Sequence, residues 1–321
     1  MPLHPDLDAF LEMANLASQS RRPMSEMTPD EARATYDAST LALDAPGAEI
    51  PVEALHIPAR DGHALPARLY RGSDTAAPAP VLLYFHGGGY VVGGLDSHDS
   101  LCRDLADAAQ CAVLSIDYRL APEHKFPTAF HDAEDACAWL RANAASLGLD
   151  PERIAIGGDS AGGTLATALC IAARHAGTPQ PRLQVLLYPC TSAHQDTASH
   201  ARLAVGYLLE QRTLQWMFGH YLRHADDRAD WRFAPLEATD LGGLAPALIV
   251  LAEFDPLVDE GHAYARRLQA AGVTAQTVVW PGVVHDFARL GNVVDEAARM
   301  RAQVGRAIAE AFHHREPSTP S

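Results

Sequence analysis

A serine in the middle of the chain has the sequence context of a catalytic nucleophile. Ser160 stands at the centre of the pattern G-x-S-x-G, which it forms with Gly158 and Gly162. The apolar run 154–156 precedes the pattern and the helix-forming stretch 164–173 follows it, which predicts a strand-to-helix turn. Such a turn exposes the serine at the carboxyl end of a sheet, where the helix N-terminus favours developing negative charge. We predict that Ser160 is a nucleophile; the alternative is a glycine-rich turn whose serine caps the helix.

Three consecutive glycines form a second motif with a chemical use. Residues 86–89 read His-Gly-Gly-Gly and directly follow an apolar, strand-like run. Glycine runs cost backbone entropy, and they suit a loop whose N–H groups must approach a ligand closely. Acyl transfer needs such donors for the tetrahedral oxyanion. We predict donors at Gly87, Gly88 and Ala161. His86 is expected to fix the loop by hydrogen bonding, and the alternatives are a flexible turn or a phosphate-binding nest.

A nucleophilic serine needs a base, and the chain offers sixteen histidines. His285 follows the last strand-like run, 277–280, through the turn Pro281-Gly282. This position places it on a loop at the carboxyl edge of the sheet, which is also the edge expected for Ser160. We therefore predict that His285 is the base.

The acid that supports the base should also follow a strand. Asp255 comes shortly after the apolar run 247–251, and Glu253 and Asp259 are nearby rivals. With Asp255 the three residues occur in the order serine, aspartate, histidine, which is the chain order of α/β-hydrolase triads. We therefore predict that Asp255 is the acid.

Strand-like runs alternate with helix-like stretches along most of the chain. This alternation predicts an α/β protein with a mostly parallel, eight-stranded sheet and helices on both faces. The predicted strands are 52–57, 65–70, 81–85, 112–116, 154–156, 183–188, 247–251 and 277–280. The predicted helices are 3–18, one that starts near Thr28, 98–109, 128–146, 161–175, 258–271 and 293–313. The tail 317–321 is expected to fray.

One interval interrupts this alternation. Residues 190–240 contain no strand-like run, and their large apolar residues recur at helical spacing over a length that is unusual for a connection. We predict a helical insertion that acts as a cap over the site. The candidate pocket residues are Tyr90, Leu208, Trp216 and Phe218; the alternative is that this stripe forms the core of the cap.

Composition excludes several other functions. The 321 residues are 48% hydrophobic, enough for a sizeable core, and the net charge of −15 argues against nucleic-acid binding. Lys125 is the single lysine, and it fits neither a G-x-x-x-x-G-K phosphate loop nor an S-x-x-K nucleophile. Five cysteines without C-x-x-C predict neither a disulfide framework nor a zinc site. Without a signal peptide or an apolar stretch of about 20 residues, we expect a soluble, cytoplasmic protein with no membrane span.

Five segments together resemble the bacterial hormone-sensitive-lipase-like esterases of the α/β-hydrolase superfamily. The segments are 86–89, 117–123, 158–163, 255–260 and 285–287. The resemblance implies an α/β-hydrolase fold whose catalytic domain spans 46–190 and 240–315. It also implies a helical cap made from 1–45 and 191–239.

The resemblance implies a serine carboxylesterase that hydrolyses short- to medium-chain carboxylic esters through an acyl-enzyme. Ser160, Asp255 and His285 match its triad, and no metal or organic cofactor is expected. The family usually has glycine after the catalytic histidine; here Asp286 follows it, and this carboxylate could raise the pKa of His285 or change the loop.

Three further points stay open at this stage. The same triad serves amidases and lactonases, so a small-molecule ester is the expected but not the exclusive partner. A ligand-binding protein with a disabled triad is a further alternative, which the presence of His285 opposes. The family often dimerises through the exposed edge of the last strand, so the resemblance suggests a homodimer.

Overall fold

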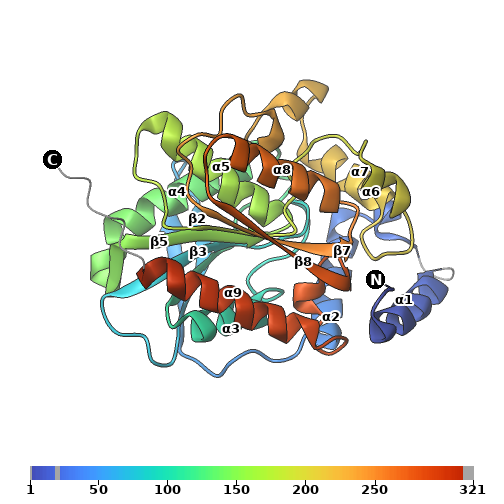
Figure 1. The fold of residues 1–321 in the computed structure, drawn as a ribbon, viewed down its shortest axis with the longest axis horizontal. Helices are drawn as coiled ribbons and strands as arrows, with labels where there is room; N and C mark the ends of the chain where they lie inside the picture. Colours follow the sequence, from blue (N-terminus) through green and yellow to red (C-terminus); the bar gives the residue numbers. More distant parts are fainter. Residues whose placement is uncertain (1, 19–21, 314–321) are drawn as a thin grey trace.

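An eight-stranded sheet forms the centre of the computed structural model, which describes residues 2–18 and 22–313 (Figure 1). The strand order is β1-β2-β4-β3-β5-β6-β7-β8. β2 is antiparallel to both its neighbours, whereas every pair from β4 to β8 is parallel, so the predicted mostly parallel sheet is confirmed. The strands are β1 Val52–Pro58, β2 Ala64–Arg71, β3 Ala79–Phe85, β4 Ala112–Ile116, β5 Leu149–Asp159, β6 Gln184–Leu187, β7 Ala247–Phe254 and β8 Ala275–Val284.

Helices cover both faces of the sheet (Figure 1). One face carries α3 (Asp99–Ala109) and α9 (Glu296–His313), and the other carries α4 (Thr128–Asn143), α5 (Ala161–Ala176) and α8 (Val258–Ala270). All seven residues of β3 are buried, as expected for a strand covered on both sides. Within the described residues, no helix combines the length and the apolar character needed to cross a membrane.

The end of the last strand differs from the prediction. β8 continues to Val284, so residues 281–282 lie inside the strand and do not form a turn after it. The register between β7 and β8 shifts between Ala252 and Phe254, and the Pro-Gly pair of β8 lies at this irregularity. The last helix begins at Glu296, three residues later than predicted. The predicted frayed tail, 317–321, lies outside the described residues.

The N-terminal region forms α1 (Pro5–Ser18) and α2 (Pro29–Leu43). The start of α2 is determined locally, because the Thr28 side chain accepts the Glu31 N–H while the Glu31 carboxylate accepts the Thr28 N–H. Pro29 occupies the first helical position, where its missing N–H costs nothing. The predicted start of this helix is therefore confirmed.

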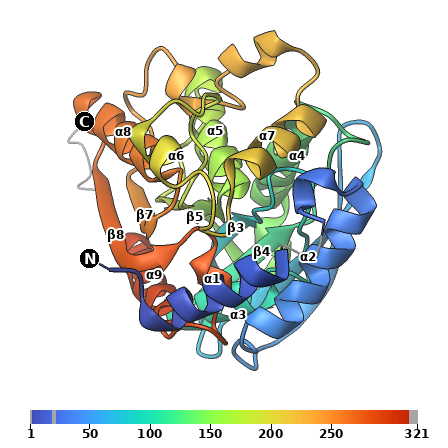
Figure 2. The same cartoon turned by 90° about the vertical axis from the view of Figure 1, so that its right-hand side faces the viewer.

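Residues 190–240 contain helices and no strand. The helices are α6 (Ala198–Arg202) and α7 (Gln211–Tyr221), followed by the short 3-10 turns η3 (Ala225–Ala229) and η4 (Pro235–Glu237). In Figure 2, α1, α2, α6 and α7 all lie on the side of the molecule that faces the viewer. The N-terminal helices and the helices of residues 190–240, which are far apart in the sequence, thus lie on the same side of the molecule.

Candidate active site

Ser160 lies on the sharp turn between β5 and α5, at the place that the sequence predicts. Its φ of 50° is positive, a conformation that residues other than glycine rarely adopt. The turn needs its two glycines, Gly158 and Gly162: a Cβ on Gly162 would lie 1.9 Å from the carbonyl oxygen of Phe85. The Ser160 N–H donates to the carbonyl of Leu187 at 2.8 Å, which anchors the turn to β6. The backbone therefore holds the serine rigidly at the carboxyl edge of the sheet.

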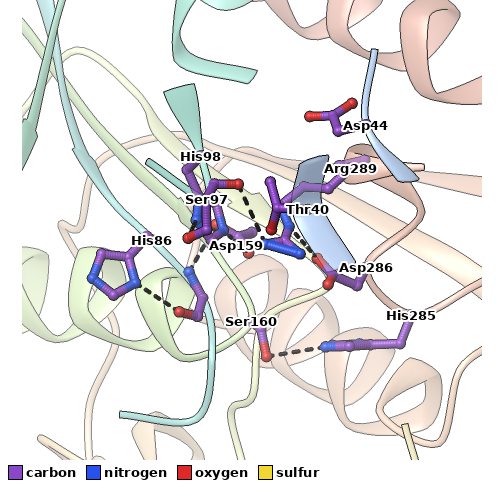
Figure 3. Close-up of polar contacts among 12 residues, drawn as sticks. Thr40, Asp44, His86, Ser97, His98, Asp159, Ser160, His285, Asp286 and Arg289 are labelled. Carbon is purple, nitrogen blue, oxygen red and sulfur yellow. Dashed lines mark hydrogen bonds and ion pairs between the residues drawn. The ribbon is translucent and has the colours of Figure 1, made fainter. Parts of the chain in front are cut away.

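The predicted nucleophile, base and acid lie in one hydrogen-bonded chain. His285 Nε2 is 3.0 Å from Ser160 Oγ, as drawn in Figure 3, and His285 Nδ1 is 2.7 Å from Asp255 Oδ2. Asp255 is 1% exposed, and its Oδ1 accepts the N–H of Leu257 at 2.8 Å. The residues come from the ends of β5, β7 and β8, which meet at the same edge of the sheet. Because β8 is parallel to β7, it ends at the same edge of the sheet, and the loop that follows β8 places the His285 imidazole beside Ser160.

The two rival acids are engaged elsewhere. Glu253 accepts the backbone N–H of Gly282 at 2.8 Å, in β8. Asp259 accepts the N–H of Ser199 at 2.7 Å and so contacts the start of α6. Asp255 is thus the one of the three that contacts the imidazole of His285.

Neighbouring carboxylates control the charge of His285. Burial alone would lower the pKa of this imidazole, but the Asp255 carboxylate opposes that effect by charge and by its hydrogen bond. Asp286 and Asp159 add further negative charge, and the resulting pKa of His285 is raised above its ordinary value of 6.5. The Tyr188 ring packs edge-on against the imidazole, with ring centroids 4.8 Å apart, and limits its rotation.

The glycine loop presents a different set of N–H groups from the predicted one. Gly87 donates its N–H to Asp159 Oδ1 at 3.0 Å, so the prediction that it donates to an oxyanion is wrong. Gly88, Gly89 and Ala161 line the cavity beside the serine, and the two glycines have φ values of 108° and 58°. Among the described residues, the N–H groups of Gly88 and Gly89 have no acceptor. The donors that remain available are therefore shifted one residue along the loop.

Asp159 is a structural residue of the site to which the sequence analysis assigned no role. Its buried carboxylate accepts the Gly87 N–H and the Tyr84 hydroxyl, at 3.0 and 2.7 Å, and lies 3.2 Å from His98 Nε2 (Figure 3). Burial alone would raise its pKa, but His98 and Tyr84 more than offset this, and the pKa is lowered. Since Asp159 directly precedes Ser160, it fixes the glycine loop to the nucleophile turn. In the sequence, its place directly before Ser160 is the feature that could have identified Asp159 as a residue of the site.

His86 fixes the same loop from the other side, as predicted. Its Nδ1 lies 2.7 Å from the carbonyl oxygen of Gly87, and its ring stacks on Tyr118 with centroids 4.3 Å apart. Burial lowers the pKa of His86 to about 3, so the ring is neutral at physiological pH. The Tyr118 hydroxyl donates to the His86 carbonyl at 2.8 Å and completes the attachment.

A cavity of about 210 Å³ lies beside the serine hydroxyl. Ser160 and His285 line it, together with the glycine loop and with side chains from α2 and α7. Tyr36 of α2 and Met217 of α7 are two of these side chains. The catalytic candidates and both helical segments therefore line the same cavity.

Three of the four predicted pocket residues line this cavity, and one does not. Tyr90, Leu208 and Phe218 are in its wall, whereas the prediction for Trp216 is wrong. The buried positions of α7 are Leu214, Met217, Phe218 and Tyr221. Trp216 lies off this helical face, half-buried, with its ring edge-on to His220 at 4.5 Å.

Known proteins resemble the chain in sequence over most of its length. A family model described as the alpha/beta hydrolase fold matches residues 82–289. An ethyl acetate hydrolase of Pseudomonas putida is 46% identical over 318 residues, which are 97% of this chain and 99% of that protein. A carboxylic ester hydrolase of Mycobacterium tuberculosis is 45% identical over 264 residues, which cover 80% of this chain and 70% of that one.

Solved structures resemble it in fold. An ester hydrolase from the metagenome of Lake Arreo superposes with a TM-score of 0.93 at 37% identity and covers 97% of this chain and 100% of its own. A thermostable esterase of Pseudomonas putida superposes equally well, at 0.93 and 33% identity, over 98% of this chain and 99% of its own. The chain therefore belongs to the α/β-hydrolase superfamily and, within it, to the hormone-sensitive-lipase-like carboxylic-ester hydrolases.

Proposed function

We propose that this ester hydrolase works by acyl transfer through Ser160, with His285 as general base and acid and Asp255 as its supporting carboxylate. One observation carries the proposal: the hydrogen-bonded chain from Asp255 through His285 to Ser160, which ends at the cavity. The distances of 2.7 and 3.0 Å are within the range that direct proton transfer requires.

The reaction has two balanced steps. His285 Nε2 takes the proton of Ser160 as Oγ attacks the ester carbonyl carbon, and the tetrahedral intermediate then expels the alcohol, which leaves with that proton. Water attacks the acyl-enzyme in the second step, again losing a proton to Nε2, and the acid leaves as Ser160 regains its proton. Asp255 accepts the Nδ1–H throughout, so it fixes the tautomer and stabilises the imidazolium.

The oxyanion is stabilised by the N–H groups of Gly88, Gly89 and Ala161. Their position in the cavity wall and the free N–H groups of the two glycines support this set. Ala161 is the first residue of α5, so the positive end of the helix dipole adds to the stabilisation.

Residues 1–45 and 191–239 act as the cap that determines substrate size. Helices α2 and α7, one from each stretch, supply side chains to the cavity wall. With a volume of about 210 Å³, the cavity is smaller than the pockets of roughly 300–1,000 Å³ that hold drug-sized ligands. We therefore assign short- to medium-chain esters as substrates; dimerisation through the edge of β8 stays a prediction.

Acyl length should discriminate strongly between substrates. We expect p-nitrophenyl acetate and butyrate to exceed the octanoate ester in kcat/KM by about tenfold or more, since the longer chain must displace part of the cavity wall. Steady-state kinetics on the three esters measures this, with p-nitroacetanilide added as the amide counterpart. Equal kcat/KM for octanoate would contradict the size assignment, and undiminished turnover of these esters by Ser160→Ala would contradict the mechanism.

Replacing Asp286 by glycine should move the acid limb of the kcat/KM profile to lower pH by roughly half a unit to one unit. The base must be neutral to act, and Asp286 is one of the carboxylates that raise the pKa of His285, so its removal lowers that pKa. Glycine also suits the φ of 66° at this position. Titration of released acid at constant pH gives the profile.

The matched control for this charge change is Glu310→Gln. Glu310 is an exposed carboxylate on α9, so its neutralisation changes the net charge equally without approaching the imidazole. An acid limb that stays in place or moves upward in Asp286→Gly, relative to this control, would show that Asp286 does not act on His285 by its charge.

A further inference from the structure

The cavity beside Ser160 has walls of two chemical kinds. Residues 208–218 contribute a wall of apolar side chains: Leu208, Leu209, Leu214, Met217 and Phe218. Another wall is polar and combines Tyr36 and Ser39 of α2 with Asp286 and Arg289. An ester that fills this space meets both kinds of wall, so its two halves face different chemistry.

Arg289 is the unusual member of the polar wall, because it is a charged side chain that is 5% exposed. Its Nε donates to Asp286 Oδ1 and its Nη1 to the carbonyl of Ser97, both at 3.3 Å (Figure 3). The guanidinium also lies over the Tyr36 ring, 4.3 Å from its centroid. A planar cation held by two hydrogen bonds and a ring has a fixed orientation.

The Nη2 group of Arg289 donates to no residue in the described part of the chain. A guanidinium carries five N–H donors, and the hydrogen bonds to Asp286 and Ser97 use only Nε and Nη1. Nη2 is not fully enclosed by the protein, so it can donate to an oxygen of a ligand that enters beside it. The cavity is where such an acceptor can enter, since Arg289 lines it.

The charge of Arg289 persists at every working pH. Burial alone would lower its pKa, but the Asp286 and Asp159 carboxylates more than offset this and raise the pKa above its ordinary value. Asp286 also neutralises much of the positive charge, so the acceptor need not be an anion. A neutral ether, hydroxyl or carbonyl oxygen is enough to accept the hydrogen bond from Arg289 Nη2.

We propose that Arg289 is a specificity-determining residue that donates a hydrogen bond from Nη2 to an acceptor oxygen of the substrate. The substrate class is then esters with one apolar half and one half that carries an oxygen beyond the ester group. The proposal rests on the function proposed above, because it assigns a second contact in the same cavity.

Two pairs of matched esters test this assignment. Butyl acetate and 2-methoxyethyl acetate differ by one CH₂ replaced by oxygen in the alcohol half. Ethyl pentanoate and ethyl 3-methoxypropanoate differ in the same way in the acyl half. We expect the kcat/KM ratio of ether to hydrocarbon ester to fall about tenfold from wild type to Arg289→Met in one of the pairs, which also identifies the half that contacts Arg289.

The use of a ratio separates recognition from damage to the catalytic loop. Arg289 contacts Asp286, so its loss could slow all esters, but a general loss cancels between the two members of a pair. Arg299→Met, a change at an arginine that is 66% exposed on α9, should leave both ratios unchanged. Arg289→Lys keeps the charge without Nη2, and it should lower the ratio even if the methionine variant folds poorly.

Two further matched pairs, each with a carboxylate in place of a methyl group, identify the acceptor. Monoethyl glutarate places a carboxylate where ethyl pentanoate has a methyl group, and 4-acetoxybutanoate does so in the alcohol half. If wild type prefers the carboxylate esters to their hydrocarbon counterparts and Arg289→Met does not, Arg289 binds the substrate as proposed and the acceptor is an anion. Ratios that are the same in wild type, Arg289→Met and Arg289→Lys for every pair would overturn it, whereas wild type that hydrolyses no ester would overturn the proposed function itself.

Discussion

Replacing Ser160 by alanine should lower kcat on short esters by roughly 10⁶-fold, the scale of loss when a nucleophile is removed from a triad. The alanine variant has no atom to form the acyl-enzyme, while His285 and the N–H donors stay in place. Residual hydrolysis should therefore remain above that in water, because the oxyanion donors still stabilise the transition state. Steady-state kinetics at high enzyme concentration measures this residue of activity.

Stability separates the loss of chemistry from the loss of fold in this variant. The backbone anchor of the turn, from the Ser160 N–H to the Leu187 carbonyl, does not involve the hydroxyl, so thermal unfolding should be almost unchanged. Ser146→Ala, at an exposed serine after α4, is the matched control and should keep full activity. A fluorophosphonate probe should label wild type and Ser146→Ala but not Ser160→Ala. Activity within tenfold of wild type in Ser160→Ala would end the case for this nucleophile.

Replacing Arg301 by methionine should lower the free energy of unfolding by about 3–5 kcal/mol, the usual cost of breaking a buried ion pair. Arg301 is 3% exposed, and its Nη2 donates to both oxygens of Asp44 at 2.6 and 2.8 Å. Its Nη1 donates to Asp104, and its Nε to the Ala288 carbonyl. Methionine fills much of the same space but leaves the buried Asp44 carboxylate without the cation that it is hydrogen-bonded to. Urea denaturation of both proteins measures the difference.

The pH dependence of that difference identifies its cause. Burial raises the pKa of Asp44, and Arg301 opposes this rise, so loss of the arginine should raise the pKa further. Protonation then relieves the unpaired charge, and the gap between wild type and variant should narrow as the pH falls from 8 to 5. Arg299→Met, two residues earlier in α9 and exposed, should change stability by less than about 0.5 kcal/mol. A gap that is constant with pH would mean that lost packing, and not the unpaired carboxylate, explains the destabilisation.

The parts of the structure that could be predicted are those whose conformation depends on residues close by in the sequence. Buried parallel strands read as continuous apolar runs, as in β3, and the capping pair Thr28 and Glu31 marks the start of α2. The site residues could be chosen because parallel strands place their carboxyl ends at one edge of the sheet. A residue that follows β5, β7 or β8 must therefore lie near this edge, and Ser160, Asp255 and His285 each do.

The predictions that failed, and the residues that were missed, concern features that depend on residues far away in the sequence. Three adjacent glycines look equivalent in sequence, but Gly87 is engaged by Asp159, which belongs to another strand. Trp216 shares an apolar stripe with Phe218, and only the phase of α7 decides which of them faces the cavity. Arg289 carries no local motif, and its orientation depends on α2, some 250 residues earlier in the chain.

The carboxylate of Asp159 has a consequence for how such an enzyme can change its substrates. The start of the glycine loop is held to the serine turn by one residue at the end of β5, through the hydrogen bond from the Gly87 N–H to Asp159. Mutations in α2 and α7 that spare Arg33, Tyr36 and Met217, whose side chains contact residues 89–91 or Arg289, can therefore accumulate without disturbing the reaction centre. In directed evolution, libraries limited to residues 39–43 and 208–214 explore new substrates at small risk to turnover, whereas substitutions at 84, 87, 98 and 159 abolish activity before new specificity can arise.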